Sequence, residues 1–142
     1  MAIQRYQDLI VWQAGDALRA EVYRLTESEP TIRDFRFRDQ LRAAAGSVTA
    51  NVVEGYRRFS PRDFARFLDV AYASAGEVAN WLDDGIARRY WTDDDLVMAR
   101  RQLRRLDGGL KSLMRYLRTQ RAADHAKDVR RALSAEDEPS ER

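Results

Sequence analysis

The sequence lacks cysteine, holds one histidine and has only three prolines among its 142 residues. Without cysteine, the chain cannot form a disulfide, a thiolate zinc site or a cysteine nucleophile. It also lacks an apolar run of about 18 residues, and residues 1–9 contain no apolar segment of the kind found in signal peptides. We therefore expect a cytoplasmic protein that does not enter a membrane. The dominance of alanine, leucine, arginine and glutamate predicts an all-α fold.

The scarcity of histidine also bears on metal binding. Di-iron four-helix bundles hold their metals with two Glu-x-x-His motifs and further glutamates. The only histidine, His125, lies beyond the helical pattern, and Glu54 and Glu77 alone make a poor set of ligands. We therefore expect no metal and no cofactor.

Apolar residues recur at helical spacing in four segments, which predicts four amphipathic helices. We place them at residues 9–27, 33–56, 61–89, and from about 92 to 121. Ser60, Pro61 and Asp63 form the clearest start signal, because they supply a cap, a first-position proline and an acid at the positive end of the helix dipole.

The fourth helix carries a heptad seam, as a bundle helix requires. Its members are Leu96, Ala99, Leu103, Leu106, Leu110, Leu113 and Leu117, and Gly108–Gly109 lies within it as a point where the helix could bend or break. Short connections between the four segments predict an antiparallel up-down-up-down four-helix bundle over residues 1–121. Residues 122–142 lose the pattern, and we expect them to form a charged, disordered C-terminal tail.

One helix stretch, at residues 40–60, carries short polar side chains beside its apolar stripe. Such groups at helical spacing are typical of a partly buried, hydrogen-bonded face. Together with two residues of the third helix they predict a structural polar network, within the bundle or between subunits. The predicted network comprises Gln40, Ser47, Asn51, Glu54, Ser74 and Glu77. A remote alternative is a small enzyme that uses Glu54 and Glu77 as an acid–base pair, but no nucleophile or phosphate-binding loop accompanies them.

Basic residues are concentrated in the C-terminal third. Residues 100–131 hold eleven basic residues and three acids, whereas residues 132–142 hold four acids and one arginine. On a helical wheel, five basic residues form a stripe on the fourth helix, away from the leucine seam. The stripe is Arg100, Arg104, Lys111, Arg115 and Arg118. It suits contact with the phosphates of RNA or DNA, and it equally suits a solvated helix face.

The chain also has more aromatic side chains than one thin bundle core readily hides. Those in question are Tyr6, Trp12, Tyr56, Phe59, Trp81, Tyr90 and Trp91. Aromatic residues are favoured at subunit interfaces, so the surplus predicts self-association.

Several segments of the sequence, in the same order, resemble the 23S rRNA intervening-sequence proteins. The matching pieces are residues 6–12, Gln40-Leu41-Arg42, Ser47, Asn51, Glu54-Gly55, Ser60, Phe64, Arg66-Phe67-Leu68, Ser74 and Glu77. The resemblance implies a four-helix bundle that assembles as a homopentamer, in a family first noticed through genes inside intervening sequences of 23S rRNA. More distantly, the chain is similar to the accessory variability protein of retroelements, which implies a basic accessory subunit.

Two main interpretations of function are open. In the first, the chain is a non-enzymatic homo-oligomer that presents a basic helix face to RNA or DNA as an accessory or assembly factor. In the second, it is a purely structural oligomer, or one that binds other proteins, and has no affinity for nucleic acid. Neither interpretation involves a membrane or a metal.

Overall fold

The computed structural model of the chain describes the backbone of residues 2–136 and the side chains of residues 2–130. Within this part the chain forms four α-helices, three short 3-10 helices and no strand. The α-helices are α1 (Ile10–Glu27), α2 (Phe35–Tyr56), α3 (Pro61–Ala87) and α4 (Val97–Glu136), and the 3-10 helices are η1 (Tyr6–Asp8), η2 (Thr31–Arg33) and η3 (Asp94–Leu96). The all-α class expected from the sequence is confirmed.

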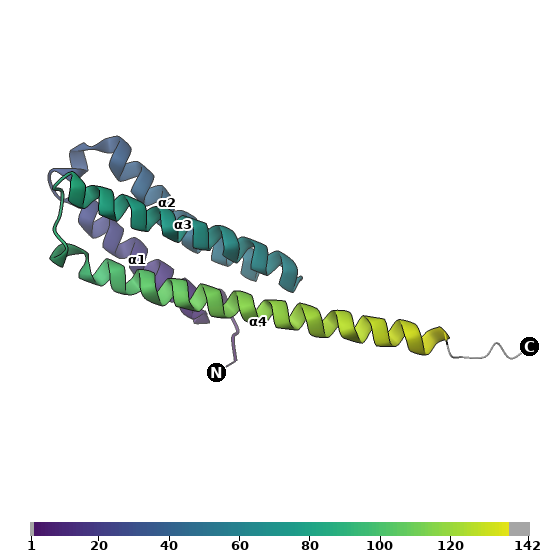
Figure 1. Ribbon diagram of the computed structural model, residues 1–142. Coiled ribbons are helices and arrows are strands. Elements are labelled where there is room, and N and C mark those ends of the chain that lie inside the picture. Colours follow the sequence, from purple (N-terminus) through teal and green to yellow (C-terminus); the bar gives the residue numbers. More distant parts are fainter. Residues whose placement is uncertain (1, 137–142) are drawn as a thin grey trace, which may run out of the picture.

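The helices surround one core. Helix α2 contacts α1 and α3, and α4 contacts the same two helices (Figure 1). Short connections join consecutive helices, which makes the arrangement compatible with the antiparallel up-down-up-down order that the sequence predicts.

The bundle has two unlike ends (Figure 1). One, which we call the closed end, holds the α1–α2 connection at residues 28–34 and the α3–α4 connection at residues 88–96. The other, the open end, holds the α2–α3 turn at residues 57–60, and α4 runs past this turn.

The leucine seam of α4 lies in the core, with one shift. Leu96, Leu106 and Leu110 are fully buried, but Leu113 is only half-buried and Met114 is buried in its place. Met114 follows Leu96 by five full turns at about 3.6 residues per turn, so its side chain returns to the same direction. A strict heptad drifts away from that direction, which explains why burial passes from Leu113 to Met114.

The predicted start of α3 is confirmed, and the glycine pair within α4 does not break the helix. The Ser60 hydroxyl accepts a hydrogen bond from the backbone N–H of Asp63 at 3.4 Å, so Ser60 caps α3. Helix α4 continues through Gly108–Gly109 without a break. A Cβ added at Gly109 would lie 3.0 Å from Cγ1 of Val11, so the glycine lets α1 approach α4 closely.

Helix α4 extends beyond the predicted limit of the bundle. Its backbone remains helical through Glu136, and residues 121–130 are all exposed. In Figure 1 this part of α4 projects past the other three helices. The separation of a bundle from a tail after residue 121 stays a prediction, and residues 137–142 of that tail lie outside the described residues.

Aromatic rings fill the closed end. The ring of Phe37 lies 5.6 Å from Trp81, 5.2 Å from Tyr90 and 5.7 Å from Trp91, measured between centroids. The indole N–H of Trp91 donates to the carbonyl oxygen of Leu82 at 2.8 Å. This cluster packs the end of α3 against the start of α2.

Asp34 ties the two connections of the closed end together. Its carboxylate accepts hydrogen bonds from the hydroxyl of Tyr90, from the backbone N–H of Phe37 at 3.3 Å, and from Nη1 of Arg88 at 3.2 Å. The Tyr90 bond is the main cause of a lowered pKa at Asp34. One carboxylate therefore caps α2 and also holds the α3–α4 connection.

Candidate nucleic-acid interface

The predicted basic stripe of α4 divides into one engaged arginine and four exposed basic residues. Arg100 is half-buried, and its guanidinium bonds to Asp93 at 2.6 Å and to Asp83 at 3.2 Å. The bond to Asp93 is the largest cause of its raised pKa. Because two carboxylates already neutralise Arg100, it has little capacity left for a phosphate.

The other members of the stripe are exposed: Arg104, Lys111, Arg115 and Arg118. The ammonium of Lys111 lies 5.6 Å from the centroid of the Tyr72 ring on α3, within the range of a cation–π contact. Among the residues that the structure describes, no ion pair engages Arg104, Arg115 or Arg118. These side chains are available to an anionic partner.

The structure places a carboxylate within this stripe. Asp107 lies between Arg104 and Lys111 along α4 and is half-buried. Burial raises the pKa of the Asp107 carboxyl above its usual range, while the charge of Lys111 opposes the shift. Sequence reasoning treated Asp107 only as one of three acids in a basic segment, although its spacing from Lys111 already put it on the same helix face.

Contacts along the α3–α4 seam set which parts of the two helices lie at the same level. Arg100 bonds to Asp83, and Lys111 lies over Tyr72. The later residue of α4, Lys111, meets the earlier residue of α3, Tyr72, so the two helices run in opposite directions here. The number of residues between the two contacts is the same on both helices. At this register the end of the stripe, residues 115–118, reaches the first turns of α3 at the open end.

A second group of arginines at the open end was missed at the sequence level. Arg57, Arg58, Arg62 and Arg66 all lie within ten residues around the α2–α3 turn, and all are exposed. Arg58 pairs with Glu54 at 2.5 Å, and both Arg58 and Arg66 lie over the ring of Phe67. Their close spacing in the sequence was the signal that could have identified them.

The predicted polar network is brought together only in part. The hydroxyls of Ser47 on α2 and Ser74 on α3 lie 2.9 Å apart, which joins the two helices. Nδ2 of Asn51 donates to the backbone oxygen of Ser47 at 2.7 Å and to its hydroxyl at 3.1 Å. These three residues form a hydrogen-bonded cluster at the α2–α3 contact.

The remaining members of the predicted network lie on the surface. Gln40, Glu54 and Glu77 are all exposed in the chain. Glu54 pairs with Arg58 of its own helix, and Oε1 of Glu77 accepts from the indole N–H of Trp81 at 3.4 Å. The structure does not join either glutamate to the Ser47 cluster, and a role for these residues at a subunit interface stays a prediction.

Most of the aromatic side chains that the sequence assigns to a surplus pack against the core. Trp91 is buried, and the half-buried rings that pack on the core are Tyr6, Trp12, Tyr56, Trp81 and Tyr90. Phe59 is the exception, because it is fully exposed. Of the aromatic residues that predicted self-association, only Phe59 is therefore fully exposed and available to another subunit.

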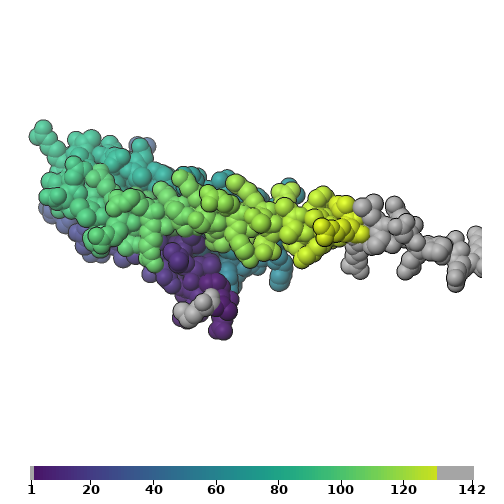
Figure 2. All heavy atoms as spheres, turned by 60° about the horizontal axis from the view of Figure 1, so that its bottom comes forward, coloured from purple at the N-terminus to yellow at the C-terminus, as the bar shows by residue number. Residues whose placement is uncertain are grey.

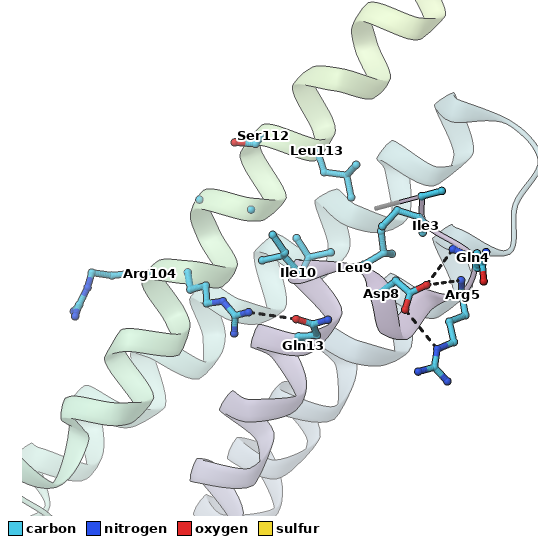
Figure 3. Close-up of a pocket in the computed structure, with 15 residues that line it drawn as sticks. Ile3, Gln4, Arg5, Asp8, Leu9, Ile10, Gln13, Arg104, Ser112 and Leu113 are labelled. Carbon is cyan, nitrogen blue, oxygen red and sulfur yellow. Dashed lines mark hydrogen bonds and ion pairs between the residues drawn. The ribbon is translucent and has the colours of Figure 1, made fainter.

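A groove of about 1380 Å³ lies between the N-terminal segment and the middle of α4 (Figure 3). Leu9, Ile10 and Leu113 contribute apolar side chains to its lining. At one edge, the Asp8 carboxylate accepts from the backbone N–H groups of Gln4 at 3.0 Å and Arg5 at 3.2 Å. Neither Glu54 nor Glu77 lines this groove, so it does not provide a cleft for the acid–base alternative.

Two features are absent from the described part of the chain. Among residues 2–130, no group of three or more histidine, cysteine, aspartate or glutamate side chains is placed to hold a metal ion. No helix in the described part of the chain combines the length and the apolar character that crossing a membrane requires.

The sequence was also compared with known proteins. The model of the 23S rRNA-intervening sequence protein family matches residues 7–112, which include all of α1, α2 and α3 and the first part of α4. No curated protein matches the chain. The more distant similarity to a retroelement accessory protein stays a prediction.

Proposed function

Because the chain belongs to the 23S rRNA-intervening sequence protein family, we propose that it binds nucleic acid without acting as an enzyme. In this proposal an antiparallel up-down-up-down bundle self-associates and offers the basic face of α4 to the phosphates of RNA or DNA. The pentamer implied by the resemblance is the assembly we expect, and the cytoplasm is the expected compartment.

The observation that carries the proposal is the state of the arginines on α4. Arg104, Arg115 and Arg118 are exposed and engage no ion pair within the described residues, in a protein whose other arginines often do. A guanidinium can donate two parallel hydrogen bonds to a phosphate. Several of them along one helix face suit a backbone of regularly spaced phosphates.

Self-association strengthens such binding without any new contact. Each subunit supplies only a few phosphate contacts, so we expect its own affinity to be weak. Linking several copies raises the effective concentration of the remaining sites once one has bound. The α2–α3 face around Ser47, Asn51 and Ser74 is the surface we assign to contact between subunits, because Ser74 is buried and the other two are half-buried already in one chain.

The test is a salt series of fluorescence anisotropy with a labelled RNA strand and a labelled duplex. We expect affinity to fall steeply with salt, with a log–log slope of about −0.7 per contact on a single strand. Reversing the charges in the double variant Arg104→Glu/Lys111→Glu should abolish binding and leave the chain folded, because both side chains are exposed. The matched control, Arg33→Glu/Arg36→Glu, changes the net charge equally at the closed end and should bind like the wild type.

Three outcomes would contradict the proposal. No binding to either probe at about 50 mM salt would favour the purely structural oligomer. Equal loss in both double variants would mean that net charge matters and the α4 face does not. Light scattering that gives only a 16.5 kDa monomer would exclude the assembly.

A further inference from the structure

Phe59 is the most exposed large apolar side chain that the structure describes. Its relative exposure is 108%, against 64% for Phe35, the next most exposed phenylalanine. Arg38 lies over the ring of Phe35 at 4.9 Å, whereas no ring or cation is placed against Phe59 among the described residues. The bare ring stands at the tip of the α2–α3 turn.

Four arginines, at positions 57, 58, 62 and 66, lie within seven residues of Phe59 in the sequence, and none is placed over its ring among the described residues. Arg58 and Arg66 lie over Phe67 instead, at 4.8 Å and 5.1 Å from the ring centroid. Arg57 and Arg62 are exposed, and no ion pair engages either of them in the described part of the chain. The tip therefore combines an uncovered aromatic face with two guanidinium groups that have no carboxylate partner among residues 2–130.

The tip lies next to the end of the α4 stripe. The register set by Arg100 with Asp83 and Lys111 with Tyr72 brings residues 115–118 of α4 to the level of the first turns of α3. In Figures 1 and 2 the blue-teal α2–α3 turn lies beside the green-yellow part of α4. The two groups of arginines therefore lie at the same level of the bundle, at the open end that holds Phe59.

We infer that Phe59 stacks on an unpaired base, and that the open end is a binding site for single-stranded nucleic acid. This inference rests on the proposed function and specifies which form of nucleic acid the surface accepts. Charge complementarity selects the partner, because a polyanion neutralises the unpaired arginines and a free base covers the ring.

Stacking needs only one exposed ring at the tip. Every base presents a flat π-face, so one exposed phenylalanine binds any unpaired base while the arginines hold the flanking phosphates. In a duplex the bases are already stacked on one another, and the ring has no face to reach. Single strands should therefore bind more tightly than duplexes, with little dependence on base sequence.

The experiment compares three labelled probes of about 15 nucleotides: a single strand, a duplex, and a single strand without bases. Phe59→Ala should weaken binding to the ordinary single strand by about 5- to 150-fold, the range for losing one stacked base. Binding to the duplex and to the abasic strand should not change. Phe35→Ala, which removes an exposed ring at the closed end, is the matched control and should change none of the three affinities.

Each other result overturns the inference in a distinguishable way. Salt-dependent binding that Phe59→Ala leaves unchanged on all three probes would refute stacking and leave the proposed function intact. No binding by the wild type to any probe would refute the proposed function and the inference with it. A smaller particle mass for Phe59→Ala would show that a second copy covers the ring.

Discussion

The two ends of the bundle use the same kinds of side chain for different purposes. At the closed end, the ring of Phe37 packs against three other aromatic rings, and Arg88 bonds to Asp34 and Asp84. At the open end, the ring of Phe59 is bare, and Arg57 engages no ion pair in the part of the chain that the structure describes. The chemical groups are alike, and only their neighbours differ.

The distribution of carboxylates accounts for the difference. At the closed end, Asp84 pairs with Arg88, and Asp83 and Asp93 pair with Arg100. At the open end, Glu54 pairs with Arg58 and leaves the other turn arginines unpaired within the described residues. The closed end thus satisfies its own interactions and stabilises the fold, whereas the open end retains the capacity to bind a partner.

The largest effect we expect comes from removing an aromatic ring at the closed end. Trp91→Ala should lower the free energy of unfolding by about 3–5 kcal/mol, because Trp91 is buried and a large cavity would remain. Phe59→Ala should leave the free energy of unfolding unchanged within about 0.5 kcal/mol, since its ring is fully exposed. Urea denaturation measures the free energy of unfolding of both variants. Similar losses in the two would show that the rings at both ends stabilise the fold.

A smaller effect is expected when the carboxylate that joins the closed end is removed. Asp34→Ala should destabilise the fold by about 1–2 kcal/mol, because α2 loses its cap and Arg88 and Tyr90 lose a partner. Asp34→Ser keeps a capping oxygen and should recover part of the loss.

The effect of Asp34 should also depend on pH. Its pKa is lowered in the folded chain, so its contribution is present above the ordinary aspartate value of about 3.9 and is lost as the pH falls through the folded value. The difference between wild type and Asp34→Ala should therefore be constant near neutral pH and shrink below about pH 4. If the difference in free energy of unfolding between wild type and Asp34→Ala grew as the pH fell, the lowered pKa of Asp34 would be contradicted.

The smallest effects are expected in the predicted polar network, on the α2–α3 face. Asn51→Ala should cost about 0.5–1.5 kcal/mol, because the Ser47–Ser74 pair loses a hydrogen-bond donor. Glu54→Ala should cost less than about 0.5 kcal/mol, since it removes only an exposed ion pair with Arg58. Thermal unfolding at low and high protein concentration separates the two cases, and a large, concentration-dependent loss for Glu54→Ala would place Glu54 in contact with another subunit.

Local patterns in the sequence predicted the helices well. Apolar periodicity located all four α-helices, and Ser60 with Pro61 marked the first residue of α3. These signals depend on neighbours a few residues apart, so the sequence contains them directly. The shift from Leu113 to Met114 shows the limit of a heptad pattern applied over several turns.

Contacts between distant residues were harder to predict. A helical wheel places Glu54 beside Ser47 and Asn51, but it gives a direction and not a depth, and the longer side chain of Glu54 reaches solvent. Likewise, nothing near Arg100 in its own helix reveals that Asp83 of α3 engages it. The candidate site is therefore defined by the arginines that have no ion pair within the described residues, which only the folded structure reveals.

The projection of α4 has a consequence for any ring of identical subunits. A helix of 40 residues is about 60 Å long, and its last part extends past the α2–α3 turn. Rotation about the axis of a ring carries each subunit into the next, so every projecting α4 must make the same angle with that axis. Arg115, Arg118 and the turn arginines then recur at equal angular intervals, and a strand that follows the ring meets the same chemical surface once per subunit.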